Sequence, residues 1–249
     1  MQVMELFQIL AKVEYDGTNY FGWQKQINQI TIQEVIENTL SKFLDENIKI
    51  IGSGRTDTGV HAINQYFSFK TTKDLPLKAY IFGLNSLLPR DIRIKGAVYV
   101  PLDFHPIFSA KKKTYIYKIL NRKEPTALDA NRVWHIPFSI NLADMNICAK
   151  KILGDNDFSA FRASSCTRKN TVRTVYESEW IREEDILTYK ITANGFLHNM
   201  VRILVGTMVE IGLGKITPED FVSIKESKDR KKAGKTAPPQ GLYLYEVYY

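Results

Sequence analysis

The residues best suited to chemistry lie in one glycine-rich turn, residues 52–62, which reads Gly-Ser-Gly-Arg-Thr-Asp-Thr-Gly-Val-His-Ala. This turn places Arg55 and Asp57 two positions apart between glycines. Glycine permits backbone turns that a Cβ atom would prevent, so such a segment can bring charged groups close to a ligand. Asp57 is therefore the first candidate functional residue, and its role depends on the partners that the rest of the chain supplies.

Arg202 is the second candidate, because it interrupts a segment that is otherwise apolar. Residues 198–211 carry hydrophobic side chains on nearly every face of a helix, which indicates a buried helix. A guanidinium group in a protein core needs a carboxylate or another acceptor. Arg202 therefore forms a structural ion pair or holds a functional acid, for which Asp57 is the best candidate by its motif. A neighbouring arginine lowers the pKa of a carboxyl group, which suits a nucleophile and not a general acid.

Tyr115 follows Lys111, Lys112 and Lys113 on a predicted strand. Proteins bind single-stranded nucleic acids through basic residues that contact phosphates and aromatic rings that stack on bases. The alternative for Tyr115 is a tyrosine that packs in the core. The net charge of +7 slightly favours a polyanionic partner, nucleic acid above all, over a merely soluble basic surface.

Several well-known catalytic motifs are absent. Gly52-x-Gly54 lacks the third glycine of a dinucleotide fingerprint, and no P-loop lysine follows it. The four histidines lack the spacing of a metal site, and we interpret most of them as structural. Asp57-Thr58-Gly59 matches the motif of aspartic proteases, but those enzymes need two carboxylates that share a proton, and the chain has no second copy.

The cysteines and the hydrophobic pattern indicate a cytoplasmic protein. Cys148 and Cys166 form no paired motif, and Cys148 falls on the apolar face of a predicted helix. Glu5, Lys12 and Glu14 interrupt the apolar residues of the N-terminus, so we expect no signal peptide. No stretch approaches the roughly 18 apolar residues that a membrane span requires.

The first half of the chain predicts the order of a ferredoxin-like fold: strand, helix, strand, strand, helix, strand. Residues 7–15 alternate between apolar and polar, and Thr31 with Glu34 forms a capping box before the first helix. The predicted elements are strands at 7–15, 48–51, 65–69 and 92–100, the last interrupted at Gly96, and helices at 32–43 and 77–88.

The second half repeats this order of elements without repeating the sequence. Asn141 is the predicted N-cap of its first helix, and Thr217-Pro218 begins its last. The predicted strands start near Lys113 and lie at 172–181, 186–193 and 242–249, with a helix at about 198–211. The basic residues 225–235 predict a mobile loop, either a solvated surface or a segment that faces RNA.

The predicted fold is therefore α+β, with two ferredoxin-like halves that form a mixed, mostly antiparallel sheet covered by helices. The predicted division is 1–105, which carries the Asp57 turn, and 106–249, which carries Tyr115 and the Arg202 helix. We expect a catalytic cleft between the halves.

Taken together, these residues resemble the tRNA pseudouridine synthase A family. Many separate motifs occur in the family's order over nearly the whole chain, and the central one departs only at Thr58, where alanine or lysine is common. The motifs are Tyr15-Asp16-Gly17-Thr18, Phe21-Gly22-Trp23-Gln24, Gly54-Arg55-Thr56-Asp57-x-Gly59-Val60-His61-Ala62, Asn85-Ser86-Leu87-Leu88-Pro89-x-Asp91-Ile92, Asp103-Phe104-His105, Lys113-Thr114-Tyr115-x-Tyr117, Asp157-Phe158-x-x-Phe161-Arg162, Phe196-Leu197-x-x-Met200-Val201-Arg202 and Thr236-Ala237-Pro238-x-x-Gly241-Leu242.

The resemblance implies that Asp57 is the nucleophile, that Tyr115 stacks on the target uracil and that Arg202 pairs with Asp57. It also implies a homodimer that binds the anticodon arm of tRNA in a basic cleft and converts uridine to pseudouridine on the 3′ side of that arm, with no cofactor and no metal. Arg55 would fill the space of the flipped base or contact a phosphate.

In the same interpretation, Lys111, Lys112 and Lys113 would bind the RNA backbone, so that affinity falls with rising salt. The alternative from another class is an RNA-binding module without catalysis. The chain shows no aromatic RNP1 motif of such modules, and a binder has little need for a buried pair of arginine and aspartate.

Overall fold

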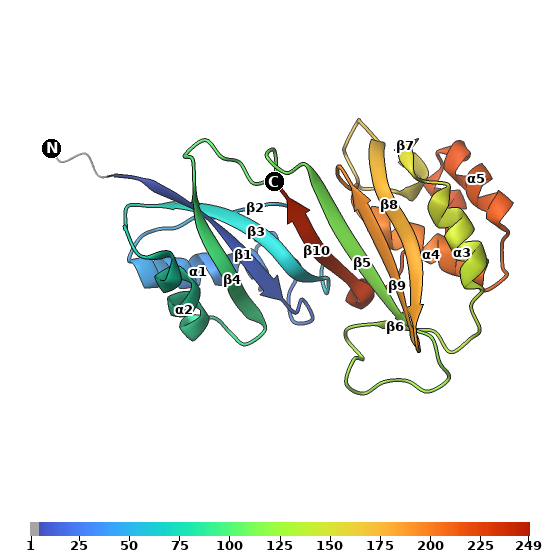
Figure 1. The fold of residues 1–249 in the computed structure, drawn as a ribbon, viewed down its shortest axis with the longest axis horizontal. Coiled ribbons are helices and arrows are strands. Elements are labelled where there is room, and N and C mark those ends of the chain that lie inside the picture. Colours follow the sequence, from blue (N-terminus) through green and yellow to red (C-terminus); the bar gives the residue numbers. More distant parts are fainter. Residues whose placement is uncertain (1–4) are drawn as a thin grey trace. The chain divides into compact units, whose positions relative to one another are not determined.

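The structure is a computed structural model that describes residues 5–249 (Figure 1). Residues 1–4 lie outside the described residues. The expectation of no signal peptide rests partly on them. The chain forms two compact units: one extends to Lys111 and also includes Leu244–Tyr249, and the other is Lys112–Tyr243. The division at residues 105 and 106 stays a prediction.

The first unit has the predicted order of elements. These are β1 (Phe7–Tyr15), α1 (Ile32–Leu44), β2 (Ile51–Gly52), β3 (His61–Thr71), α2 (Leu77–Leu87) and β4 (Ile92–Val100). The strands follow the order β4-β1-β3, with β2 paired to β3 and every one of these pairings antiparallel. This is the strand order of a ferredoxin-like fold. The last strand, β10 (Leu242–Tyr248), follows β3 in the sheet.

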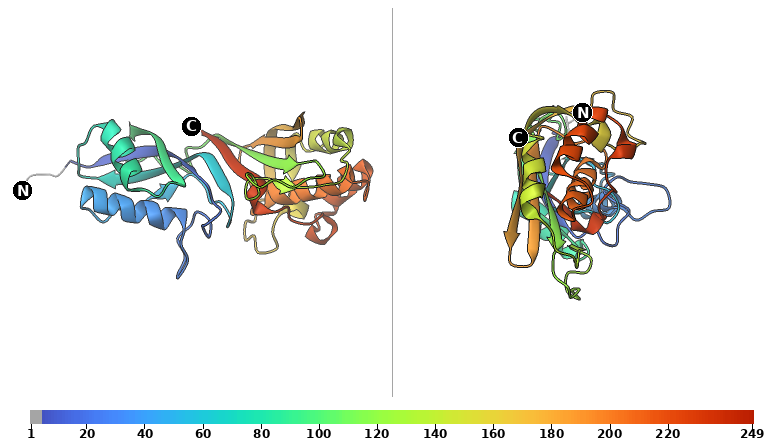
Figure 2. Two further views of the ribbon diagram at one scale, coloured as in Figure 1. Left: turned by 90° about the horizontal axis from the view of Figure 1, so that it is seen from below. Right: turned by 90° about the vertical axis from the view of Figure 1, so that its right-hand side faces the viewer.

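The core of the first unit follows from two sequence patterns. Ile9, Ala11, Val13 and Tyr15 alternate along β1 and are buried. The side chain of Thr31 caps α1 by accepting a hydrogen bond from the N–H of Glu34, as the capping box predicts. The buried side of α1 lies against one face of the strands (Figure 2). One helix and one strand pattern therefore account for much of this core.

The strand predicted at 48–51 is shorter than expected, because α1 takes up its backbone hydrogen bonds. The N–H of Ile48 donates to Ser41 Oγ (3.0 Å), and the N–H of Ile50 donates to Glu37 Oε1 (3.1 Å). Only Ile51–Gly52 remains to pair with β3. The predicted interruption of β4 at Gly96 is a bulge, since Lys12 pairs with Gly96 while Val13 pairs with Ile94.

The second unit contains the other elements: β5 (Lys112–Leu120), β6 (Trp134–His135), α3 (Leu142–Lys150), β7 (Gly154–Asp157), β8 (Val172–Glu183), β9 (Ile186–Ala193), α4 (Met200–Gly212) and α5 (Pro218–Ser227). Its strands follow the order β5-β9-β8-β7, with β6 parallel to β5. The series β5-α3-β8-β9-α4 repeats the series β1-α1-β2-β3-α2, with β6 and β7 added. The short strands β6 and β7 were not predicted. The fold is α+β, as expected.

The helix α4 is buried as predicted, and every residue in it except Arg202 and Glu210 is inaccessible. Helices α3 and α5 contact it (Figure 1). The chain after α5 approaches α4 so closely that a Cβ atom on Gly206 would lie 1.8 Å from the carbonyl oxygen of Lys235. The segment that ends in residue 237 is therefore held against this helix.

The prediction of a mobile loop at residues 225–235 is wrong. This segment contains the end of α5 and a 3₁₀ turn at Arg230–Lys232. The guanidinium group of Arg230 donates to the carbonyl oxygens of Ala233 and Gly234, both at 3.1 Å, and to Thr236 Oγ1 at 3.1 Å. One arginine of the basic run thus fixes the backbone of the residues that follow it.

No helix within residues 5–249 combines the length and apolar character needed to cross a membrane.

Candidate functional site

The turn that carries Asp57 connects β2 to β3 and is fixed at both ends. At its start, Ser53 donates its N–H to the carbonyl oxygen of Tyr66 (2.7 Å), and its hydroxyl donates to the side chain of Gln65. Gln65 Nε2 donates to the carbonyl oxygen of Gly54 (2.9 Å). At its end, the N–H of Val60 donates to the carbonyl oxygen of Asp57 (3.1 Å). Asp57 is half-buried between these fixed points.

A second loop, residues 16–24, braces the same turn. The N–H of Trp23 donates to the carbonyl oxygen of Thr56 (3.1 Å), and the Tyr15 hydroxyl lies 2.7 Å from Thr56 Oγ1. Gly22 has a φ of +80°, and a Cβ atom there would lie 2.5 Å from the carbonyl oxygen of Thr56. Only glycine meets both conditions, so the two loops form one interlocked structure around Asp57.

The aromatic residues of this second loop divide into two groups. Tyr20 and Trp23 are buried, with the Trp23 ring centroid 6.0 Å from that of Tyr15 and 6.3 Å from that of Phe67. Phe21, by contrast, is 47% exposed. Two of the three aromatic side chains therefore support the turn, and Phe21 is the one that faces solvent.

His61 is a structural histidine, as expected for most histidines of the chain. It is buried, and its Nδ1 accepts a hydrogen bond from the N–H of Gly17 (3.0 Å) and lies 3.2 Å from Asp16 Oδ1. These contacts join the beginning of β3 to the loop at residues 16–24. The sequence signal for them is the Asp-Gly pair that directly follows β1.

Arg55 lies in the same turn as Asp57 and is exposed. Its position two residues before a half-buried carboxylate leaves its long side chain at the surface, where it can contact a large ligand.

Tyr115 lies on β5 opposite Ile191 of β9. It is 9% exposed, and its ring meets Phe196 edge-on, with the centroids 4.9 Å apart and the planes at 78°. Phe196 belongs to the motif that leads into α4, so the tyrosine and the Arg202 helix are connected through one aromatic contact. The sequence alone did not indicate this contact.

Lys112 and Lys113 begin β5, and Lys111 directly precedes them. Lys111 belongs to the first unit and Lys112 to the second, and successive residues on a strand point to opposite faces. Within β5, Lys113 shares the face of Tyr115, and Lys112 points to the other face. Burial and the nearby charge of Arg168 lower the pKa of Lys113 to about 8.

Arg168 lies near Lys113 and belongs to a group of cations that was not predicted. Arg162 donates to the carbonyl oxygen of Arg168 (2.9 Å), and burial together with the charge of Arg168 lowers the pKa of Arg173. Burial disfavours the thiolate of Cys166, but the N–H groups of Arg168 and His198 and the charges of Arg162 and Arg168 outweigh it, so the pKa of Cys166 is lowered. Mutually repelling cations of this kind are suited to bind an anion. Of these arginines, only Arg162, which ends the motif at residues 157–162, was singled out from the sequence.

Arg202 is held by two neutral acceptors of its own unit. Its Nε donates to the carbonyl oxygen of Ala237 (2.8 Å), and its Nη1 donates to Asn199 Oδ1 (3.0 Å). The N–H of Ala237 returns a bond to the carbonyl oxygen of Arg202 (3.0 Å). The expectation that this guanidinium needs acceptors is correct, and these two were not predicted. They fix the orientation of the guanidinium plane.

No group of three or more histidine, cysteine, aspartate or glutamate side chains in the described part of the chain could hold a metal ion.

The comparison with known proteins identifies the family. A family model described as tRNA pseudouridine synthase matches residues 11–109 and 148–249. The chain belongs to the tRNA pseudouridine synthase family. Asp57 and Arg202 lie inside the matched ranges, whereas Tyr115 and the cations Lys111, Lys112 and Lys113 lie between them.

Similar proteins cover almost the whole chain. A protein of Thermoanaerobacter sp. (strain X514) named tRNA pseudouridine synthase A is 48% identical over 97% of this chain and 99% of its own length. Proteins of the same name from Geotalea uraniireducens and Ruminiclostridium cellulolyticum are 46% and 44% identical, each over 97% of this chain and 99% of its own length. The expected resemblance is confirmed, and the chain is an isomerase of uridine in tRNA.

Proposed function

We propose that this synthase converts uridine to pseudouridine on the 3′ side of the anticodon arm of tRNA, with Asp57 as the nucleophile. The observation that carries the proposal is the fixation of the Asp57 turn by β3 and by the loop at residues 16–24. Preorganised placement of a reacting group is what catalysis by position requires. The half-buried carboxylate and the exposed Arg55 lie on this one rigid turn.

The reaction breaks the bond between N1 of uracil and C1′ of the ribose and forms a bond between C5 and C1′. C5 loses its hydrogen, and N1 gains a proton, so the reaction needs no oxidant or reductant. An ionised carboxylate can add to the uracil ring or assist departure at C1′. We propose that no metal or organic cofactor takes part.

The other residues would bind the base and the backbone. In this proposal Tyr115 stacks on the uracil after it leaves the RNA stack, which offsets part of the lost stacking. Arg202 acts on the same uridine as the charge partner of Asp57. Arg55 fills the space of the flipped base or contacts a phosphate. Lys113 binds phosphate together with the arginines around it, and Lys111 and Lys112 contribute charge to the backbone contacts.

Release of tritium from tRNA that carries 5-tritiated uridine tests the proposal, because C5 loses its hydrogen only when the new bond forms. The wild-type protein should release tritium in the presence of EDTA, and Asp57→Asn should abolish release while tRNA binding persists. Asp45→Asn is the matched control. Asp45 ends α1 with a φ of 53°, a conformation that asparagine also adopts, so this variant should retain full activity.

Two outcomes would overturn the proposal. Release at the wild-type rate by Asp57→Asn would remove Asp57 as the nucleophile. Modified positions outside the anticodon arm, mapped on bulk tRNA after reaction, would reject the proposed target.

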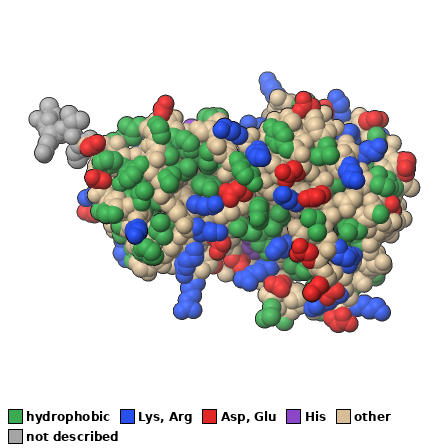
Figure 3. All heavy atoms as spheres, in the orientation of Figure 1, with side chains coloured by type: hydrophobic (Ala, Val, Ile, Leu, Met, Phe, Trp, Pro, Cys, Tyr) green, Lys and Arg blue, Asp and Glu red, His purple; other side chains and the backbone are tan. Residues whose placement is uncertain are grey.

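We further propose that the protein acts as a homodimer in the cytoplasm. Hydrophobic side chains gather on the part of the first unit that carries β1 and β4 (Figure 3). Leu6, Val98, Tyr99 and Leu102 are between 41% and 51% exposed there. An exposed apolar patch of this kind is suited to contact another protein. Light scattering on the purified protein should give twice the mass of one chain.

A further inference from the structure

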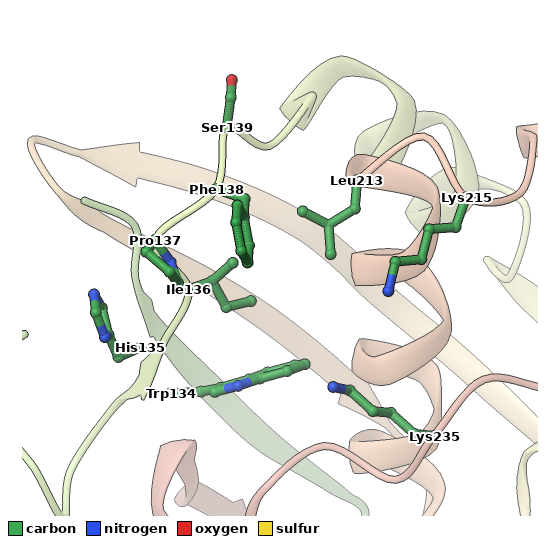
Figure 4. Close-up of a pocket in the computed structure, with 9 residues that line it drawn as sticks. All are labelled: Trp134, His135, Ile136, Pro137, Phe138, Ser139, Leu213, Lys215 and Lys235. Atoms are coloured by element: carbon green, nitrogen blue, oxygen red, sulfur yellow. The ribbon is translucent and has the colours of Figure 1, made fainter. Parts of the chain in front are cut away.

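A cavity of about 560 Å³ lies entirely within the second unit (Figure 4). We call it the Trp134 pocket. It is lined by Trp134, His135, Ile136, Pro137, Phe138, Ser139, Leu213, Lys215 and Lys235. Its volume falls within the range of small-molecule sites, and its lining joins hydrophobic and aromatic side chains to two ammonium groups. None of the residues proposed for catalysis lines it.

The floor and walls of the pocket are flat and apolar. Trp134 lies across the floor, and Phe138 and Leu213 point into the space (Figure 4). Phe138 is 68% exposed, so its ring is accessible to a ligand. Trp134 is supported from behind by Tyr117, which it meets edge-on with the ring centroids 6.2 Å apart. The pocket therefore presents a supported ring face.

One positive charge lies over this ring, and a second is turned toward the pocket. Lys235 Nζ is 5.0 Å from the Trp134 ring centroid, and the ammonium group of Lys215 is turned toward the same space (Figure 4). Neither ammonium group forms an ion pair with a carboxylate within residues 5–249. The nearby Glu210 carboxylate accepts instead from the backbone N–H of Lys235 (3.4 Å) and does not line the pocket.

The pocket adjoins the residues that hold Arg202. Lys235 precedes by two residues the carbonyl group of Ala237 that accepts from Arg202 Nε. Tyr117, behind Trp134, donates its hydroxyl to the carbonyl oxygen of Pro238 (2.7 Å) in the same segment. The pocket wall at residues 134–139 lies outside the ranges that the family model matches, whereas Leu213, Lys215 and Lys235 lie inside them.

We propose that the Trp134 pocket binds one nucleotide of the tRNA substrate other than the uridine that reacts. Its base stacks on Trp134 beside Phe138, and its phosphate lies between Lys215 and Lys235. An aromatic face next to unpaired cations is the combination that binds single-stranded nucleic acid. The inference rests on tRNA as the substrate and is independent of the nucleophile and of the modified position.

Tryptophan fluorescence tests the stacking directly. The chain has three tryptophans, and Trp23 and Trp180 are only 1% and 4% exposed. Unmodified tRNA should therefore quench mainly the emission of Trp134 in the Asp57→Asn protein, which does not turn it over. Adding Trp134→Phe should remove most of the quenching while affinity is kept, because phenylalanine can still stack.

Binding and kinetics test the whole site. Trp134→Leu should weaken tRNA binding about tenfold, the scale of one lost stacking contact. Lys215→Ala and Lys235→Ala should each reduce the salt slope of log K by about 0.7–0.9, one phosphate contact each. All three variants should keep the wild-type kcat at saturating tRNA. The matched control is Lys150→Ala, an exposed lysine at the end of α3 outside the pocket, which should keep both affinity and slope.

Full-length tRNA and an isolated anticodon arm serve as the two probes. A defect with both probes places the nucleotide in the arm, and a defect with the full-length tRNA alone places it elsewhere in the tRNA. Wild-type affinity and salt slope in all three variants, with quenching kept in Trp134→Phe, would overturn the proposal. So would a change of oligomeric state at unchanged RNA affinity. If the wild-type protein released no tritium, the proposed function would be wrong. The pocket proposal would be unaffected, because it is tested by tRNA binding.

Discussion

A Cβ atom on Gly22 would lie 2.5 Å from the carbonyl oxygen of Thr56, the residue before the proposed nucleophile. The same atom would lie 3.0 Å from the carbonyl carbon of Asp57. Real Cβ atoms do not approach backbone atoms this closely, so any side chain at position 22 must push the catalytic turn away. The geometry of the Asp57 turn thus depends on a residue 35 positions earlier in the chain.

Gly22→Ala should therefore lower kcat about 10- to 100-fold, since a displacement of about 1 Å at a catalytic group has costs of that size. The matched control is Gly154→Ala. Gly154 has a similar φ, +78°, but a Cβ atom there meets nothing within 4 Å. Both variants suffer the backbone strain of a positive φ, and only Gly22→Ala should lose kcat. Tritium release under saturating tRNA measures the difference, and equal losses would contradict the argument.

The sequence predicted the elements whose signals are local. The capping box at Thr31 and the alternation along β1 gave correct boundaries, and the buried helix around Arg202 was recognised from its apolar faces. Strands β6 and β7 were not predicted from the sequence, because they are short and show no strong hydrophobic periodicity. The predicted strand before Gly52 was too long. Two of its backbone N–H groups donate to the side chains of Ser41 and Glu37 in α1 and not to a neighbouring strand.

The candidate site residues were chosen from the sequence as single residues, and the contacts that hold them were not predicted. Asp57, Tyr115 and Arg202 are distinctive in type and context, and the family model covers the motifs around Asp57 and Arg202. The acceptors of Arg202 and the cations around Lys113 come from residues far apart in the chain, so no spacing pattern reveals them. The role of the lysine triplet stays a prediction; Lys112 and Lys113 are consecutive on β5 and point to opposite faces.

Arg202 should contribute to stability as well as to the reaction. Arg202→Gln removes the bonds to Ala237 and Asn199, so the free energy of unfolding should fall by about 1–3 kcal/mol. Arg202→Lys should not restore it, because a lysine lacks the fork of N–H groups that reaches two acceptors. Urea denaturation followed by circular dichroism measures this change.

The control for Arg202 is Arg182→Gln on β8. Arg182 donates to Asn121 Oδ1 (2.9 Å) at an exposed position, where a single hydrogen bond has little effect on stability. Its free energy of unfolding should stay within about 0.5 kcal/mol of the wild type. A loss equal to that of Arg202→Gln would show that the effect is not specific to the buried helix.

Cys166 should react with alkylating reagents much faster than Cys148. Positive arginines and two backbone N–H groups outweigh burial and lower the pKa of Cys166, whereas burial raises the pKa of Cys148 to about 12. The thiolate is the reactive form, so labelling by iodoacetamide at pH 7.5, a value at which only about a tenth of ordinary thiols are ionised, should favour Cys166. Mass spectrometry of peptides gives both rates from one sample, with Cys148 as the internal control.

Bound tRNA should slow the alkylation of Cys166. The arginines that stabilise its thiolate, Arg162 and Arg168, belong to the cation cluster proposed to bind phosphate. A phosphate there would shield their charge and block access. An unchanged rate in the presence of saturating tRNA would contradict the assignment of this cluster to the RNA backbone.

Lys113 should make tRNA binding depend on pH. Burial and the charge of Arg168 lower its pKa in the folded protein from 10.5 to about 8. The folded state therefore binds fewer protons than the unfolded state between these values, and the contribution of Lys113 to the free energy of unfolding rises with pH across this window. A phosphate beside the side chain favours the protonated form, so binding of tRNA draws a proton to Lys113.

The affinity for tRNA should consequently be highest below pH 8 and fall as the pH rises through that value. Lys113→Arg should flatten this dependence, because arginine stays charged throughout the range. Lys113→Met should also flatten it, but at the weaker affinity that the wild type reaches at high pH. Titrations of unmodified tRNA into the Asp57→Asn protein between pH 7 and about 9.5, a range that spans the lowered pKa, measure all three curves. An equally steep fall in Lys113→Arg would assign the titration to another group.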